Sequence, residues 1–271
     1  MYLASLRDAR MVPGMPAEFA VKNASVDKLH HVGERHAAVR EVAIHASVAG
    51  HRNVPELYAH CRWMRRVLVA SELMRGGDVD DALSQCGGAL PWPVIRDVGV
   101  QVASALTHMH AKCVGHCDIK PANVMFRDPM DAAGGNTVKV VDFGLATRFT
   151  RCGGRVTAVR VHGGTYEYMA PEALADEPHD PTLSDVYSVG AMLFQLATGL
   201  LPFPVQQKDV DDWEAHLLKR KHARVSWPPW ARGTPAFKAL VIRMLAGDPC
   251  DRPALDEVVG VLHADCPFDT G

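Results

Sequence analysis

Length, composition and charge exclude several classes of protein. The chain has 271 residues, enough for one large domain or two small lobes with a substantial core. A formal charge of −2 gives no reason to expect nucleic-acid or membrane partners. Seven cysteines without a C-x-x-C pair fit neither a disulfide framework nor a zinc site, and they favour a reducing compartment, the cytoplasm.

The first elements predict a small α+β lobe. "EFAVKN" (18–23) alternates like a half-buried strand, with Ala20 and Lys22 on one face. Residues 34–49 have helical spacing that places Val39, Val42, Ala43 and Ala46 on a shared side. "RRVLVASELM" (65–74) then predicts a strand that leads into the connector "RGGD" (75–78).

The second part of the chain predicts a larger helical lobe. Residues 92–111 have the pattern of a long amphipathic helix, and "NVMF" (123–126) and "TVKVV" (137–141) predict a hairpin around a turn at 127–136. The apolar stretch 186–205 is about as long as a membrane span, but polar residues interrupt it, so we expect a buried helix. We therefore predict lobes at 1–74 and 79–271 joined by 75–78, with a ligand cleft between them.

Two short motifs carry the chemistry. "HCDIKPAN" (116–123) places the carboxylate Asp118 two residues before Lys120 and five before Asn123. "DFG" (142–144) follows a predicted strand and supplies a second carboxylate, Asp142. Oxygen ligands in this small number suit Mg²⁺, and we predict Asn123 and Asp142 as its ligands. His116 is expected to be a packed residue that orients the loop.

Together these motifs resemble the catalytic domain of a eukaryotic-type protein kinase over nearly the whole chain. The resemblance implies a two-lobed α+β fold and transfer of the γ-phosphate of Mg·ATP to protein Ser/Thr hydroxyls, with Asp118 as catalytic base and Lys120 near the γ-phosphate. It also implies that Lys22 of "AVK" holds the α/β-phosphates and pairs with Glu41. "APE" (170–172) closes an activation segment that includes Thr165, and Arg252 is the expected buried partner of Glu172.

By the same resemblance, several residues surround the nucleotide. Ala20 and Met125 would sandwich the adenine, and Ser71 would be a small gatekeeper residue that admits bulky ATP analogues. Glu72 and Met74 of the connector also belong to the expected ATP site. Asp78 would hold the ribose.

The sequence departs from the family pattern at three places. Cys117 replaces the arginine that normally reads a phosphate on the activation segment, so we expect activity without that phosphorylation. Its thiol is either a packed small side chain or a group activated by His116 and Lys120. The glycine-rich loop ahead of Lys22 is expected to be missing, as if the sequence began just past it. His45 replaces an apolar residue that packs on Phe143, and charging it there would be costly.

Partners and rival functions follow from the remaining charges. No acid lies between Phe143 and Tyr166. This basic segment either binds acidic or pre-phosphorylated partners or is simply a solvated loop. Ala122 stands where arginine-directed kinases of the family often carry a glutamate, which argues against a basic substrate. A pseudokinase scaffold and a nucleotide-sensing module are the alternatives to a working kinase. The oligomeric state is open. The basic residues of the segment are Arg148, Arg151, Arg155, Arg160 and His162.

Overall fold

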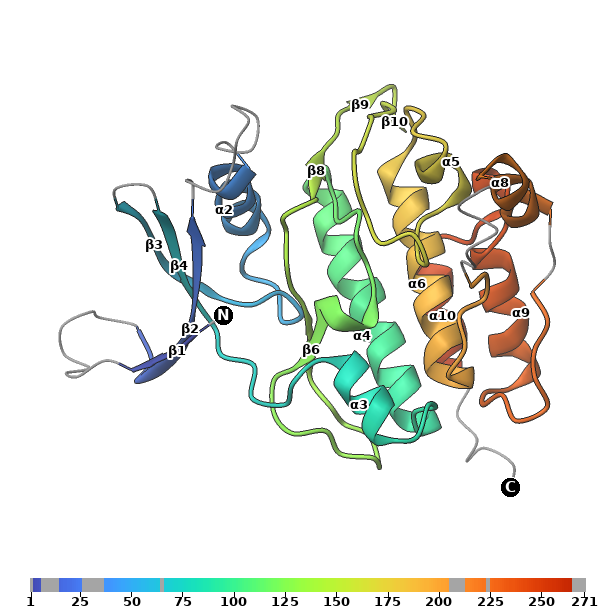
Figure 1. Cartoon of the computed structure of the whole chain (residues 1–271), viewed down its shortest axis with the longest axis horizontal. Coiled ribbons are helices and arrows are strands. Elements are labelled where there is room, and N and C mark those ends of the chain that lie inside the picture. Colours follow the sequence, from blue (N-terminus) through green and yellow to red (C-terminus); the bar gives the residue numbers. More distant parts are fainter. Residues whose placement is uncertain are drawn as a thin grey trace.

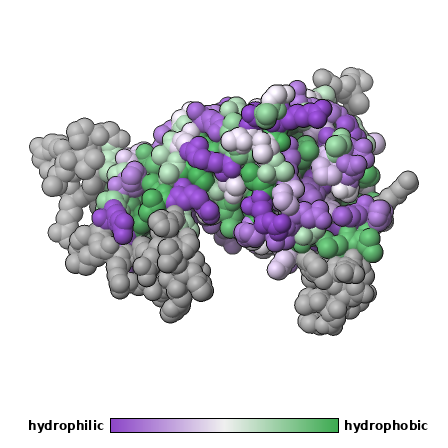
Figure 2. Space-filling model, turned by 90° about the horizontal axis from the view of Figure 1, so that it is seen from above, coloured by the Kyte–Doolittle hydropathy of each residue, from purple (hydrophilic) through white to green (hydrophobic). Residues whose placement is uncertain are grey.

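The computed structural model describes residues 2–5, 15–25, 37–63, 66–204, 213–222 and 225–264. A four-stranded sheet and one helix lie on one side, and a larger assembly of helices lies on the other (Figure 1). On the face seen in Figure 2, hydrophilic and hydrophobic residues are intermixed over the larger part of the molecule. The fold class is therefore the predicted two-lobed mixture of sheet and helices.

The sheet is antiparallel, in the spatial order β1-β2-β4-β3. Alternation along β2 predicted this strand correctly, and its register places Ala20 opposite Ser71 and Lys22 opposite Val69. The "YLA" segment forms β1, beside β2. The predicted absence of a glycine-rich loop concerns the stretch ahead of Lys22, where residues 6–14 lie outside the described residues. The strands are β1 (Tyr2–Ser5), β2 (Glu18–Ser25), β3 (Leu57–Trp63) and β4 (Arg66–Ser71).

Helix α2 (Ala37–Val48) forms where helical spacing predicted it, but the predicted buried face was wrong. Its buried residues are Val42, Ile44, His45 and Val48, whereas Val39 is 47% exposed. Nearly every residue of this stretch is small or apolar, so the apolar positions circle the helix and do not single out one stripe. The observed rotation turns Glu41 and His45 toward the cavity described below.

The linker after β4 is bound to the helical part by its backbone. Arg75 N donates to Arg127 O (2.9 Å) and Gly76 N to Phe126 O (3.1 Å). A Cβ at Gly76 would lie only 2.1 Å from Asp128 O, so glycine alone permits this close approach. The linker thus holds the two sides of the cleft at a defined separation.

The helical part is built on α6. Asp180 caps this helix and Pro181 begins it, and Gly199 ends it with φ 75°. Nearly all of its residues are buried, as predicted for 186–205, although the helix ends at Thr198. The helices here are α3 (Val79–Gln85), α4 (Trp92–Ala111), α5 (Pro171–Leu174), α6 (Pro181–Thr198), α8 (Trp213–His222), α9 (Pro235–Met244) and α10 (Leu255–Ala264).

Short strands carry the loops that face the cleft. The predicted hairpin forms between β6 and β7, and β5 pairs with β8, so both sides of the 116–123 loop are held by strands. Within the described ranges, no helix combines the length and apolar character that a membrane crossing requires. These strands are β5 (Val114–Gly115), β6 (Val124–Phe126), β7 (Val138–Val140), β8 (Thr147–Arg148), β9 (Arg151–Cys152) and β10 (Arg155–Val156).

Candidate active site

The loop 116–123 is held from below by one buried carboxylate. Asp185 of α6 is fully buried and accepts the backbone N–H groups of His116 (2.9 Å) and Cys117 (2.8 Å). Its Oδ2 also lies 2.8 Å from His110 Nε2. Cys117 has φ 65°, a strained conformation for a non-glycine residue, and these bonds hold it there. The loop is therefore a rigid platform for the next residue, Asp118.

The Asp118 carboxylate is surrounded by donors. Oδ1 accepts Thr165 N (3.0 Å) and Oγ1 (2.8 Å), and Oδ2 accepts Asn123 Nδ2 (2.9 Å) and Lys120 Nζ (2.9 Å). Burial works to raise the pKa of Asp118, but the bonds from Lys120, Thr165 and Asn123 outweigh it and lower the pKa. Asp118 is thus ionised and fixed in orientation. Its four acceptor positions are filled, so an incoming hydroxyl takes the place of one of these donors.

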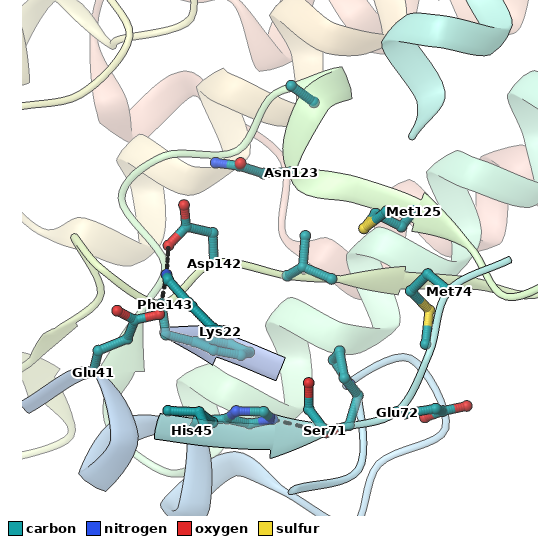
Figure 3. A pocket seen from close by; sticks show the side chains of 14 residues that line it. Lys22, Glu41, His45, Ser71, Glu72, Met74, Asn123, Met125, Asp142 and Phe143 are labelled. Atoms are coloured by element: carbon teal, nitrogen blue, oxygen red, sulfur yellow. Dashed lines mark hydrogen bonds and ion pairs between the residues drawn. The ribbon is translucent and has the colours of Figure 1, made fainter. Parts of the chain in front are cut away.

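A second charged group spans the cleft. Lys22 of β2 donates to Glu41 Oε1 of α2 (2.5 Å) and to Asp142 Oδ1 (3.2 Å), which comes from the far side (Figure 3). Burial disfavours the charged form of Lys22, but the two carboxylates outweigh it and raise its pKa. Lys22 therefore stays an ammonium aimed into the cleft.

Asn123 and Asp142 supply oxygen atoms suited to a hard cation. Both line the same cavity, and the Asn123 amide nitrogen is occupied by Asp118 O (2.8 Å) and Oδ2, which leaves the amide oxygen as the free ligand atom. Asp142 has φ 63°, a conformation that aspartate tolerates. In the described parts of the chain, no group of three or more His, Cys, Asp or Glu side chains is arranged so that it could hold a metal ion. This donor set fits a divalent ion that takes few protein ligands.

The cavity has a volume of about 250 Å³ and lies between the sheet and the helical part. It brings together most of the predicted nucleotide residues: Lys22, Glu41, Ser71, Glu72, Met74, Asn123, Met125 and Asp142. The Glu72 carboxylate is turned to Lys139 Nζ (2.6 Å), so Glu72 offers the cavity its backbone side. Val69 and Val141, which the sequence reasoning missed, also line it. Val69 lies two residues before Ser71 on β4, and this same-face spacing is the signal that could have found it. Val141 comes directly before Asp142, just past the end of β7.

Two predicted nucleotide residues do not line this cavity. Ala20 is 1% exposed and lies on β2 opposite Ser71, at the edge of the cavity. Asp78 begins α3, where its Oδ1 accepts Asp81 N (2.8 Å). The carboxylate of Asp78 is thus already engaged as a helix cap.

Cys117 and His45, the two residues that depart from the family pattern, both pack against neighbouring side chains. Burial, followed by the nearby Asp185 carboxylate, raises the pKa of the Cys117 thiol well above its ordinary value, which favours a packed side chain over an activated thiol. The His45 ring stacks on Phe143 at 4.8 Å between centroids, as predicted, and its Nε2 lies 2.8 Å from Pro55 O. Burial lowers the pKa of His45.

The predicted ion pair below the activation segment is present. Arg252 Nη1 and Nη2 donate to Glu172 Oε1 (2.6 Å) and Oε2 (2.9 Å). The Arg252 side chain is fully covered and that of Glu172 is 13% exposed. This bidentate pair holds α5 against the core of the helical part.

Comparison with known proteins agrees with this geometry. The protein kinase domain family matches residues 15–262. CBL-interacting protein kinase 20 of Oryza sativa subsp. japonica is 32% identical over 231 residues, 81% of this chain and 45% of that protein. Serine/threonine-protein kinase pkn3 of Myxococcus xanthus is 37% identical over 198 residues, 70% of this chain and 34% of that protein.

The chain spans about half the length, or less, of these curated relatives. Serine/threonine-protein kinase STY46 of Arabidopsis thaliana is 28% identical over 250 residues, which are 91% of this chain and 40% of that protein. Protein kinase domains in general use ATP, a divalent metal ion and a protein substrate. Because the domain match extends over most of the sequence, the chain belongs to the protein kinase family.

Proposed function

We propose that this chain is a serine/threonine protein kinase that transfers the γ-phosphate of Mg·ATP to protein hydroxyls. The observation that carries the proposal is the Asp118 carboxylate, ionised and oriented by Lys120, Asn123 and Thr165. Phosphoryl transfer asks the protein mainly for positioning and charge stabilisation. The names of the relatives, which are serine/threonine kinases, support the class of acceptor.

Each site residue has a role in this proposal. Asp118 orients the acceptor hydroxyl and takes its proton, while Lys120, beside it, stabilises charge on the transferred group. Lys22, held by Glu41, binds the α/β-phosphates. Asn123 and Asp142 hold Mg²⁺. The metal, when bound, neutralises charge on the phosphates.

In this proposal the adenine occupies the end of the cavity away from Lys22 and Asp142. Ala20 and Met125 enclose the base, Ser71 leaves room behind it, and Glu72 and Met74 meet it from the linker. Asp78 binds a ribose hydroxyl when its carboxylate gives up the capping bond from Asp81 N. In this proposal residues 1–74 and 79–271 are the two lobes, and 75–78 is the hinge between them.

The test is phosphotransfer from γ-labelled ATP with Mg²⁺ to a generic protein acceptor and to the chain itself. Asp118→Asn and Asp142→Asn should each abolish the label, whereas Asp128→Asn, an exposed carboxylate paired with Arg127, should leave it unchanged. A thermal-shift titration with ATP accompanies it. A shift without label transfer would favour the nucleotide-sensing module, and neither a shift nor label would favour the scaffold.

The preferred substrate is proposed from two charged regions. Arg148, Arg151 and Arg155 are exposed and favour acidic residues on a protein partner. Asp80 and Glu167 line a groove beside Lys120, and they favour a cation close to the acceptor hydroxyl. A peptide array that varies charge at each position separates the two: an acidic optimum far from the acceptor supports the first, and a basic optimum next to it supports the second.

The proposed compartment is the reducing cytoplasm, because the seven cysteines lack the spacing of a disulfide framework. A formal charge of −2 gives no support for nucleic-acid or membrane partners. Cell fractionation with an antibody to the chain checks the compartment.

A further inference from the structure

The activation segment, residues 142–172, is attached to the helical part at several places along its length. At its start, β8 pairs with β5. Near its end, Thr165 binds Asp118 through its N–H and hydroxyl groups. Between these, Val159 and His179 exchange backbone hydrogen bonds in both directions (2.9 and 3.0 Å). The middle of the segment is therefore tied to the turn that follows α5.

Side chains around this middle attachment alternate between two sides. Val161 is 7% exposed and lines a small cavity together with Cys117 and Met169. Arg160 and His162, its neighbours on either side, are exposed and both reach Asp176. This is the period of two expected of extended backbone. The segment thus presents an apolar side to the core and a cationic side to one carboxylate.

Asp176 makes three polar contacts with this cationic side. Its Oδ2 lies 2.9 Å from Arg160 Nη1 and its Oδ1 lies 3.2 Å from His162 Nδ1. Arg160 Nη1 also donates to the main-chain carbonyl of Asp176. No acidic residue lies between Phe143 and Tyr166 in the sequence, so a carboxylate that balances this stretch must come from elsewhere in the fold. Asp176 is that carboxylate for Arg160 and His162.

The position of Asp176 is well defined. Its φ is 53°, a left-handed conformation that Asp and Asn adopt more readily than other non-glycine residues. Its N–H donates to Ala173 O (3.2 Å) at the end of α5, the helix that Glu172 and Arg252 fix to the core. The carboxylate therefore stands on a rigid support.

We propose that Asp176 is a positioning residue that anchors the activation segment through Arg160 and His162, and so keeps Thr165 in place on Asp118. Thr165 comes three residues after His162, beyond Gly163 and Gly164, whose φ values of 97° and 138° only glycine adopts readily. The proposal rests on the proposed kinase function. In this arrangement the Asp176 carboxylate orders the activation segment, and no phosphate on the segment is needed.

The test combines amide hydrogen exchange with kinetics on the full chain. In Asp176→Asn and Arg160→Gln, exchange at residues 159–165 should rise by about 2- to 5-fold, the effect of losing exposed ion pairs. The double variant should show less than the sum of the two single increases, because both changes remove the Arg160–Asp176 ion pair. The KM for the protein acceptor should rise by a similar factor, while the KM for ATP stays unchanged. Asn suits the left-handed conformation, so the variant should fold.

For the exchange measurement, Arg155→Gln is the matched control, since it removes a basic side chain of the same segment that has no ion pair with a described residue. Exchange in Asp176→Asn equal to that in Arg155→Gln would overturn the proposal, as would additive effects in the double variant. A merely structural role would lower the thermal midpoint and raise both KM values together. If the wild-type chain transfers no phosphate, the proposed function fails, and the exchange measurement still decides whether Asp176 anchors the segment.

Discussion

Replacing Arg252 by Met should be among the most destabilising single changes in the helical part. The guanidinium donates to both Glu172 oxygens and also to Ala246 O (3.0 Å) and Leu183 O (3.0 Å). Met keeps the apolar stem but removes all four bonds. Among the described residues, Glu172 would keep only the hydroxyl of Ser184 (2.9 Å) as a side-chain donor. Its carboxylate, 13% exposed, would lose the counterion that Arg252 provides.

Breaking one side of a buried ion pair costs about 3–5 kcal/mol, because the remaining charge is uncompensated. For a domain of this size that loss lowers Tm by roughly 10 °C. Burial acts to raise the pKa of Glu172, but the bonds from Arg252 outweigh it and lower the pKa below the ordinary value of 4.5. The pair therefore stabilises the fold above about pH 4.5 and loses this contribution as pH falls through the folded-state pKa.

Urea unfolding followed by tryptophan fluorescence at neutral pH measures the loss. The double variant Glu172→Met with Arg252→Met is the matched control. It should lose less than Arg252→Met alone, because no unpaired charge remains. A loss below about 1 kcal/mol for Arg252→Met, or a double variant whose loss equals the sum of both singles, would refute the reasoning.

Three further predictions concern the cleft and its cysteine. Burial lowers the pKa of His45, so the unfolded chain takes up a proton at this residue before the folded chain does as pH falls below about 6.5. Stability and activity should therefore drop with pH in this range. His45→Leu should flatten this pH dependence, and a slope equal to that of the wild type would contradict the prediction. Ser71→Phe should abolish use of an ATP analogue with a benzyl group on the adenine amine while ATP itself is still used, measured by label transfer; equal use of the analogue by both proteins would count against Ser71 as gatekeeper. In timed alkylation followed by mass spectrometry, Cys117 should react only on unfolding; early labelling would disprove its packed role. The exposed thiols should react first: Cys61, Cys86, Cys152 and Cys250.

Several parts of the fold and site could be predicted from sequence because the information is local. Alternation along "EFAVKN" indicated β2, and the hairpin at 124–140 followed from two short apolar runs around a turn. The motif "HCDIKPAN" places Asp118, Lys120 and Asn123 on one loop, so their proximity depends on only a few backbone angles. The resemblance to protein kinases extended this to Lys22, Glu41 and Asp142, which are far apart in the chain.

The tertiary structure alone decided which side of each element faces the cleft. Helix α2 is apolar around most of its circumference, so only packing against the sheet and the helical part selected Val42, Ile44, His45 and Val48. Asp78 matched a binding position in the family pattern, yet the start of α3 engages its carboxylate.

The contact between Asp176 and Arg160 was likewise invisible in the sequence. The two residues belong to segments with no shared motif, and they meet because α5 is fixed from below by Arg252 while Val161 packs beside Cys117. Local patterns determine which residues can form a strand, a loop or a charged site. Which of these residues come into contact depends on how the elements pack, because the burial of the whole core fixes the relative positions of distant segments.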